Sequence, residues 1–341
     1  MAHLVVVSFR LGGTDGVSIE AEKWITALRS LGHCVRTVAG DGVADVIMPE
    51  LAIRADRSPD LDELARALAD ADLIVVENMA ALPLNVAARD MLYRVLDGRR
   101  AIFRHHDLAW QRPSSNDDEA PRNNPQWRHV TINDLSGREL RARGVSSETI
   151  RNAFDCSPPT GRRALARRAI KVANEPVLLF PTRAIPRKNV EGALELAASL
   201  DAVLWLLGPP EDGYDATLRQ LVAKSSARVI SGRPEGLDIH DAYAGCDLVV
   251  MPSTWEGFGN PVLESVTHRR PLAVYPYPVL EEIMAFGFRF FGLDDVEAIA
   301  TFLDEPSDEL LEHNSRIARM HFNEADLPGR LAPLLEALGV K

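Results

Sequence analysis

The chain has 341 residues, of which 46% are hydrophobic and 26% are charged, and its formal net charge is −11. This length is comfortable for two domains of ordinary size. The acidic balance argues against nucleic acid as a partner, because phosphate contacts require a basic surface. Three scattered cysteines without a C-x-x-C pair indicate a reducing compartment, with neither a disulfide framework nor a zinc site.

The N-terminal residues run directly into a predicted strand, without a basic region or a cleavage site. No apolar run reaches the roughly 18 residues that a membrane-spanning helix needs. We therefore expect a cytoplasmic protein.

In the first half, strand-like apolar runs alternate with amphipathic helical runs, which predicts a parallel sheet covered on both faces. The strand at 129–132 is expected to be the last of this half. In chain order we expect strand 3–9, a glycine loop at 12–16, helix 18–31, strand 35–39, helix 60–71, strand 73–77, helix 83–96, strand 101–105, strand 129–132 and helix 136–143.

Residues 151–175 form a join that contains two prolines and a glycine. A second α/β unit follows, and a final helix over 327–338 ends at Gly339. The fold class is thus α/β, with domains at 1–157 and 158–322 and a closing segment at 323–341. The expected elements of the second unit are strand 177–181, helix 190–200, strand 202–207, helix 216–224, strand 228–230, helix 239–244, strand 248–251, helix 261–268 and strand 272–275.

The most informative segment runs from Glu256 to Glu264, just after an apolar strand. Two carboxylates bracket a glycine-rich turn and the first turn of a helix, for which Asn260 is the predicted cap and Pro261 the first residue. Acceptor-only carboxylates suit vicinal hydroxyls of a sugar or ribose, and a helix start attracts anions. The segment therefore predicts a nucleotide-sugar site.

This segment resembles the E-x7-E signature of retaining glycosyltransferases of family 4, which have the GT-B fold. That fold has two Rossmann-like parallel-sheet domains facing across a cleft, with a C-terminal helix that crosses back to the first domain. The run from Phe180 to Asn189 is similar to the family's strand-end loop, and Gly12-Gly13 to its N-terminal glycine loop. The resemblance covers nearly the whole chain.

The resemblance implies roles for residues of the second domain. Arg183 and Lys188 would hold the donor pyrophosphate, as a bidentate guanidinium and a point charge, and Arg187 could substitute in part. Glu264 would accept the ribose hydroxyls, and Glu256 a hydroxyl of the donor sugar. Further contacts to the donor are expected from the backbone amides of Phe258, Gly259 and Asn260.

In the first domain, Gly12 and Gly13 would let backbone amides approach the β-phosphate, and Thr14 and Asp15 could line the acceptor site. The turn His105-His106-Asp107 resembles the family's histidine-containing acceptor loop. We favour His106 with Asp107 as the residues that contact the acceptor hydroxyl or the donor sugar. Because loops at the carboxyl ends of strands gather at one edge of a sheet, all these residues are expected around one interdomain cleft.

The predicted function is transfer of a hexosyl group, with retention and without a metal or other cofactor, from a nucleoside-diphosphate sugar to a hydroxyl of a polar acceptor. Alternatives on the same fold are a sugar-nucleotide epimerase and a glycosyl phosphorylase, and the remaining class is a non-catalytic binding module. The donor base, the acceptor and the oligomeric state stay open.

Charge is uneven along the chain, because residues 122–171 hold 11 basic against 4 acidic residues, whereas residues 1–121 hold 13 against 19. The basic segment includes Arg162, Arg163, Arg167, Arg168 and Lys171. It indicates either a solvated helix face beside the domain hinge or contact with an anionic membrane or acceptor. Any membrane contact is expected to be peripheral at most.

Overall fold

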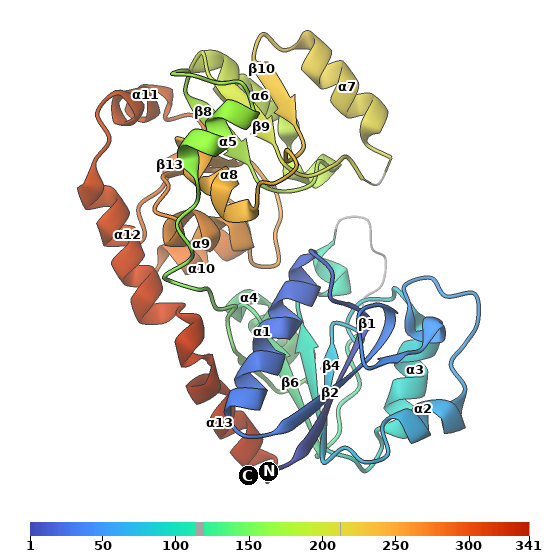
Figure 1. Cartoon of the computed structure of the whole chain (residues 1–341). Helices are drawn as coiled ribbons and strands as arrows, with labels where there is room; N and C mark the ends of the chain where they lie inside the picture. Colours follow the sequence, from blue (N-terminus) through green and yellow to red (C-terminus); the bar gives the residue numbers. More distant parts are fainter. Residues whose placement is uncertain (113–118, 212, 341) are drawn as a thin grey trace. The chain divides into compact units, whose positions relative to one another are not determined.

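A computed structural model of the protein describes residues 1–112, 119–211 and 213–340 (Figure 1). The chain divides into two compact units. Unit 1 comprises Met1–Ala153 together with Glu324–Lys341, and unit 2 comprises Phe154–Asn323. Each unit is a parallel sheet with helices packed on it, which confirms the predicted α/β fold class.

Unit 1 is built on a seven-stranded sheet in the order β3-β2-β1-β4-β5-β6-β7. The prediction that residues 129–132 form the last strand was wrong, because the three-residue β7 pairs beyond it and is too short to carry a periodic signal. The strands are β1 His3–Leu11, β2 Cys34–Gly42, β3 Val46–Ile47, β4 Leu73–Glu77, β5 Ala101–His105, β6 Trp127–Thr131 and β7 Ser147–Thr149. The α-helices are α1 Gly16–Ser30, α2 Leu61–Ala67, α3 Val86–Val95, α4 Asp134–Ala142 and α13 Leu327–Ala337, and the 3-10 turns are η1 Pro49–Leu51, η2 Ala109–Gln111 and η4 Glu324–Asp326.

Unit 2 contains a six-stranded sheet in the order β10-β9-β8-β11-β12-β13. Its strands are β8 Val177–Phe180, β9 Val203–Leu206, β10 Arg228–Ser231, β11 Leu248–Met251, β12 Leu272–Val274 and β13 Phe291–Gly292. Its helices are α5 Arg163–Ala169, α6 Val190–Ser199, α7 Asp215–Lys224, α8 Ile239–Gly245, α9 Asn260–Thr267, α10 Pro278–Met284, α11 Val296–Asp304 and α12 Asp308–His321, with the 3-10 turn η3 Pro186–Lys188.

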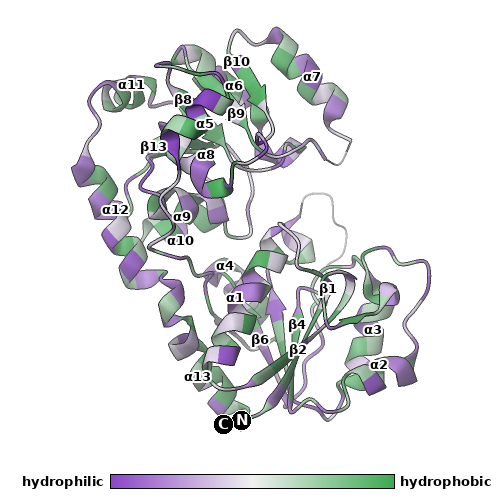
Figure 2. Cartoon of the chain, in the orientation of Figure 1, coloured by the Kyte–Doolittle hydropathy of each residue, from purple (hydrophilic) through white to green (hydrophobic). Residues whose placement is uncertain are grey.

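The strands are apolar because helices cover both faces of each sheet. In unit 1, β4 and β5 are buried along their whole length, and separate apolar clusters lie on the two faces. Figure 2 shows the strands as mainly hydrophobic, whereas the helices carry hydrophilic as well as hydrophobic residues. This pattern is what amphipathic helices on a two-sided parallel sheet require.

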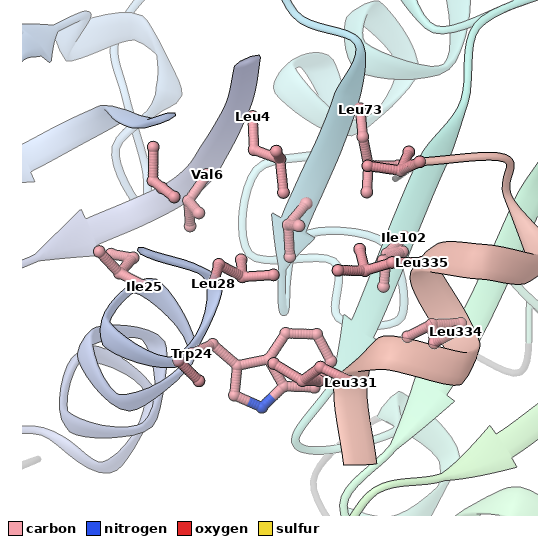
Figure 3. Close-up of a cluster of buried hydrophobic side chains, with 14 of the residues drawn as sticks. Leu4, Val6, Trp24, Ile25, Leu28, Leu73, Ile102, Leu331, Leu334 and Leu335 are labelled. Carbon is pink, nitrogen blue, oxygen red and sulfur yellow. The ribbon is translucent and has the colours of Figure 1, made fainter. Parts of the chain in front are cut away.

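Helix α13 lies far along the chain from the rest of unit 1 but packs in its core. Leu331, Leu334 and Leu335 pack in one buried cluster with Trp24 of α1 and Leu4 of β1 (Figure 3). The expectation that the final helix returns to the first domain is therefore confirmed. Burying large aliphatic side chains contributes roughly 1.5–3 kcal/mol each, so this helix is integral to unit 1.

The sequence prediction left residues 276–326 without elements, although α10, β13, α11 and α12 lie there. A seven-residue helix and a two-residue strand are too short to show a clear period. The 14 residues of α12 alternate charged and apolar side chains at helical spacing, and this signal could have found it.

Counted within each unit, the strand order is 3-2-1-4-5-6 in unit 2 and the same with a seventh strand added at the end in unit 1. In this doubly wound order the direction of winding reverses between the first and fourth strands, and ligands bind outside the carboxyl ends of the strands at that switch point. In unit 1 the switch point lies between β1 and β4, and in unit 2 between β8 and β11. The loops after β1, β8 and β11 carry most of the predicted site residues.

The basic segment is tied into unit 2. Arg162 pairs with Asp241 at 2.5 Å, and Arg163 and Arg167 both pair with Asp247. Arg163 and Arg167 also donate to carbonyls at the C-terminal end of α8, where cations stabilise a helix. The Arg162 and Arg163 side chains remain 55% and 43% exposed, which agrees with a solvated face, whereas Arg167 is only 11% exposed and departs from it. The guanidinium groups of all three link the start of α5 and α5 itself to the rest of unit 2.

No helix in the described part of the chain is both long and apolar enough to cross a membrane.

Candidate functional site

In unit 2, the loops after β8 and β11 meet through a buried ion pair. Lys188, at the end of η3, places Nζ 2.5 Å from Oε1 of Glu256, and both side chains are less than a tenth exposed. Arg187 donates to Oε2 of Glu256 at 2.9 Å and to the carbonyl of Trp255. Glu256 thus has one cation on each of its two carboxylate oxygens.

The electrostatics of this pair follow from burial and mutual attraction. Burial lowers the pKa of the Lys188 ammonium, against the attraction of Glu256, and the cations of Arg187 and Arg183 lower it further. Burial pushes the pKa of Glu256 upward, but Lys188 and Arg187 outweigh it and the net shift is downward. The pair is therefore ionised at neutral pH, with Lys188 as a desolvated cation beside a fixed carboxylate.

Arg183 lies on the same loop as Lys188 but is exposed. Its Nη1 atom is 2.6 Å from Oε2 of Glu211, and both side chains are nearly half exposed. A surface pair of this kind is weak and open to exchange. Arg183 can therefore leave Glu211 for a stronger anionic partner at little cost, whereas Lys188 is fixed.

The helix after the glycine-rich turn begins differently from the prediction. Gly259, and not Asn260, is the N-cap of α9, with φ of 90° and no side-chain cap hydrogen bond. A Cβ atom at Gly259 would lie 2.2 Å from Oη of Tyr277, so only glycine fits. Asn260 is the first helical residue and Pro261 follows it, which shifts the predicted cap by one position.

The side chain of Glu264, in α9, is oriented by a buried tyrosine of α8. Tyr243 donates its hydroxyl proton to Oε2 of Glu264 at 2.8 Å. His268 lies one turn further along, stacks on the Tyr243 ring at 4.3 Å, and donates from Nδ1 to the Glu264 carbonyl. Burial raises the pKa of Tyr243 well above its usual value, so the hydroxyl stays a donor.

Phe258 is part of the hydrophobic core of unit 2. Its side chain is 3% exposed and stacks against Phe154, with its edge toward Phe322. Its carbonyl accepts a hydrogen bond from Tyr277 at 2.9 Å. Any contact from Phe258 to a ligand therefore comes from its backbone, as the sequence interpretation supposed.

In unit 1, Gly12 and Gly13 follow β1 and precede α1. Gly12 has φ of 70°, and a Cβ atom there would lie 2.7 Å from that of Val43. Asp15 caps α1, accepting from the backbone and the hydroxyl of Ser18. The prediction that Asp15 could line an acceptor site is thus incomplete, because its carboxylate already compensates the start of this helix.

The two adjacent histidines of the β5 end point in different directions. Nε2 of His105 lies 2.9 Å from Nδ1 of His129 in the interior, whereas Nε2 of His106 lies 2.8 Å from Oε2 of Glu77. Asp107 pairs with Arg112 at 2.7 Å, and its backbone N–H joins that of His106 on Oδ1 of Asn78. Of the two histidines, His106 belongs to the loop at the sheet edge.

Sequence reasoning missed a buried charged network behind His106. Arg104 is fully buried and contacts carboxylates of Glu77 and Glu20, and Lys23 lies 2.6 Å from Glu20. The guanidinium of Arg104 also stacks on Trp24. An arginine in the middle of a strand that is otherwise apolar must be paired, and this signal could have revealed the network.

Among residues 1–112, 119–211 and 213–340, no group of three or more His, Cys, Asp or Glu side chains is arranged to hold a metal ion.

Comparison with known families and proteins gives consistent matches. Residues 162–318 match the family described as glycosyl transferases group 1. The chain is 25% identical to mannosylglucosylglycerate synthase of Thermotoga maritima, over 94% of this chain and 96% of that protein. It is 26% identical to the enzyme of the same name from Petrotoga mobilis, over 84% and 86% of the two chains.

Solved structures share the fold over the whole length. Sucrose-phosphate synthase from Thermosynechococcus elongatus aligns with a TM-score of 0.75 at 15% identity, covering 99% of each chain. Anabaena Alr3699/HepE in complex with UDP and glucose aligns with a TM-score of 0.71 at 15% identity, covering 99% of this chain and all of that one. At these identities the likeness establishes the architecture only.

Proposed function

We propose that this protein transfers a glycosyl group from a nucleoside-diphosphate sugar to a hydroxyl of a small polar acceptor. The proposal starts from the match of residues 162–318 to glycosyl transferases group 1. The observation that carries the proposal is the arrangement at the switch point of unit 2. There a buried, desolvated cation, an exchangeable arginine and two fixed carboxylates lie on the loops after β8 and β11 and within α9.

The donor's parts match these groups. Lys188 and Arg183 would bind the diphosphate, with Arg183 leaving Glu211 to do so, and would offset the charge that develops as the nucleoside diphosphate departs. Glu264, oriented by Tyr243, would accept hydrogen bonds from the ribose hydroxyls. Glu256 would accept from a hydroxyl of the donor sugar. The backbone amides of Phe258, Gly259 and Asn260, at the start of α9, would contact the donor's sugar and phosphate.

Retention without a covalent intermediate is the mechanism that we propose. A carboxylate nucleophile must be able to leave its partners and attack the anomeric carbon. Both oxygens of Glu256 are held by cations, and Tyr243 holds one oxygen of Glu264. This favours front-face attack, in which the acceptor hydroxyl enters on the side from which the diphosphate leaves and a phosphate oxygen takes its proton. The three nearby cations supply the charge stabilisation that a metal ion supplies elsewhere.

We propose that unit 1 binds the acceptor. Gly12 and Gly13 would lie near phosphate, and His106 and Asp107 near a reacting hydroxyl or a sugar hydroxyl. Two relatives that align over most of the chain are named mannosylglucosylglycerate synthase. This supports a small, polar, hydroxyl-bearing acceptor. A nucleotide sugar carrying mannose is accordingly the first donor to assay.

The test combines binding with product analysis. A thermal-shift screen of UDP, GDP and ADP, with and without their sugars, identifies the donor because a ligand that binds only the folded state raises the melting temperature. Transfer is then assayed with small polar acceptors, and the anomeric configuration of the product is read by NMR. Stabilisation by no nucleotide sugar would overturn the proposal. Sugar-nucleotide conversion in the absence of acceptor would instead indicate an epimerase.

A chelator supplies the test of metal independence. Transfer should proceed at an unchanged rate after exhaustive treatment with EDTA. A loss that added Mg²⁺ or Mn²⁺ restores would contradict this part of the proposal.

A further inference from the structure

We infer that Glu77 is a positioning residue that fixes which nitrogen of His106 carries the proton, so that the ring offers Nδ1 as an acceptor to a substrate hydroxyl. The inference deepens the proposed function and rests on it, since His106 is there placed beside a hydroxyl of the acceptor or donor sugar. It adds to the site a residue that does not itself touch substrate.

The first step is the contact between the two side chains. Nε2 of His106 lies 2.8 Å from Oε2 of Glu77, whose side chain is fully buried. An ionised carboxylate only accepts, so Nε2 must donate, and in the neutral ring the lone pair is on Nδ1. The backbone N–H of His106 is fixed on Oδ1 of Asn78 at 2.9 Å. Within the described part of the chain, Nδ1 has no hydrogen-bond partner.

The second step is the role of Arg104. The register of β4 and β5 places Glu77 opposite Arg104, and Nη1 of Arg104 lies 3.3 Å from Oε1 of Glu77. Arginine only donates, so this oxygen faces Arg104 and the other oxygen faces His106. Burial alone would raise the pKa of Glu77, but Arg104 and His106 lower it, so the carboxylate stays ionised. Arg104 therefore fixes the direction of the Glu77–His106 hydrogen bond, with His106 as the donor.

The third step is what an amide would do at this position. In Glu77→Gln, the carbonyl oxygen must face the donor-only Arg104, which turns the NH2 group toward His106. Nε2 must then accept, and the proton moves to Nδ1. A nearly isosteric change thus converts Nδ1 of the ring from acceptor to donor.

The experiment reads the tautomer directly. Protein labelled with 15N at histidine is examined at pH 8 by long-range 1H–15N correlation, and His106 is assigned by its absence in His106→Gln. The wild type should show a protonated Nε2, and Glu77→Gln a protonated Nδ1. The control is Glu20→Gln, which removes the other carboxylate of Arg104 and should keep Nε2 protonated. Glu77→Asp retains an acceptor-only group and should also keep it.

Activity provides the second readout. With the donor and acceptor found for the wild type, Glu77→Gln should lower kcat/KM by about a hundredfold, the scale of a misoriented reacting group. Glu20→Gln should stay within a few-fold, although it disturbs the same arginine. A purely structural role for Glu77 would give similar losses in both variants.

Three outcomes would overturn the inference. These are a wild-type His106 with the proton on Nδ1, an unchanged tautomer in Glu77→Gln, and an inverted tautomer with normal transfer. A wild type without transferase activity would instead overturn the proposed function, because the tautomer is measured without substrate. If Glu77→Gln does not fold, the wild-type and Glu77→Asp spectra still decide the matter.

Discussion

Lys188 and Glu256, 68 residues apart in the chain, form a buried ion pair with Nζ 2.5 Å from Oε1. The sequence assigned one to diphosphate and the other to a sugar hydroxyl, as if the cationic and anionic ends of the site were separate. In the folded chain the two side chains form one ion pair, so each residue holds the other in place before a donor binds. This preorganisation keeps a cation in a desolvated position, where its interactions with other charges are weakly screened by water.

Breaking this pair should affect stability as well as chemistry. Lys188→Met leaves Glu256 buried beside only Arg187, and we expect a loss on the order of 3 kcal/mol in the free energy of unfolding. The double variant Lys188→Met with Glu256→Gln removes both charges and should recover part of that loss, while donor binding stays abolished. Denaturant unfolding and nucleotide titration of the single and double variants measure the two effects. Equal stability of Lys188→Met and wild type would contradict the buried pair.

If Glu264 binds ribose, its hydrogen-bond partner Tyr243 should affect nucleotide affinity. Tyr243→Phe removes one of the hydrogen bonds that orient the Glu264 carboxylate, so the affinity for the preferred nucleoside diphosphate should fall about fivefold, corresponding to about 1 kcal/mol. Glu264→Gln should weaken it further. Calorimetric titration with the nucleotide and its 2′-deoxy analogue checks the cause, because the two ligands should bind Glu264→Gln almost equally. A full difference between the two ligands in that variant would refute the ribose contact.

The glycine at the start of α9 should tolerate no side chain. Gly259→Ala forces a Cβ onto Oη of Tyr277 at a φ of 90°, and we expect about 1–3 kcal/mol of destabilisation with loss of donor binding. The matched control is Gly329→Ala in α13, where nothing lies within 4 Å. There alanine should be neutral or stabilising by up to about 1 kcal/mol. Thermal unfolding ranks the two variants.

Buried neutral histidines should make the protein sensitive to mild acid. Burial lowers the pKa of His129 and of His268 from 6.5 to about 4, and lowers that of His105 well below its usual value. The unfolded chain then binds more protons than the folded one between about pH 6.5 and pH 4. Stability should be complete above that window and fall as the pH falls through it, by roughly 3 kcal/mol for His129 or His268.

Denaturant unfolding at pH 7, 6 and 5 measures this slope. The double variant His105→Leu with His129→Leu replaces a buried polar pair by apolar side chains of similar size and should flatten the part that unit 1 contributes. An unchanged slope in that variant would show that these two histidines do not set the acid sensitivity.

Local signals in the sequence determined the alternation of strands and helices and the glycine turns, and they singled out the candidate site residues of unit 2. These follow from periods of two and 3.6 residues and from residue types that only certain ligands or dihedral angles favour. The same signals failed for β7 and β13, which are too short to show a period, and they misplaced the cap of α9 by one residue. A cap depends on a single pair of backbone angles, which composition does not specify.

Only the tertiary structure decided which charges face each other. Glu77 meets Arg104 because β4 and β5 are neighbours in a particular register, and Glu20 reaches the same arginine from α1, 84 residues away. Lys188 meets Glu256 because β8 and β11 adjoin at the switch point of their sheet. Each residue type was visible in the chain. The energy of a charge, however, depends on burial and on partners at a few ångströms, which strand order and packing fix only when the chain folds.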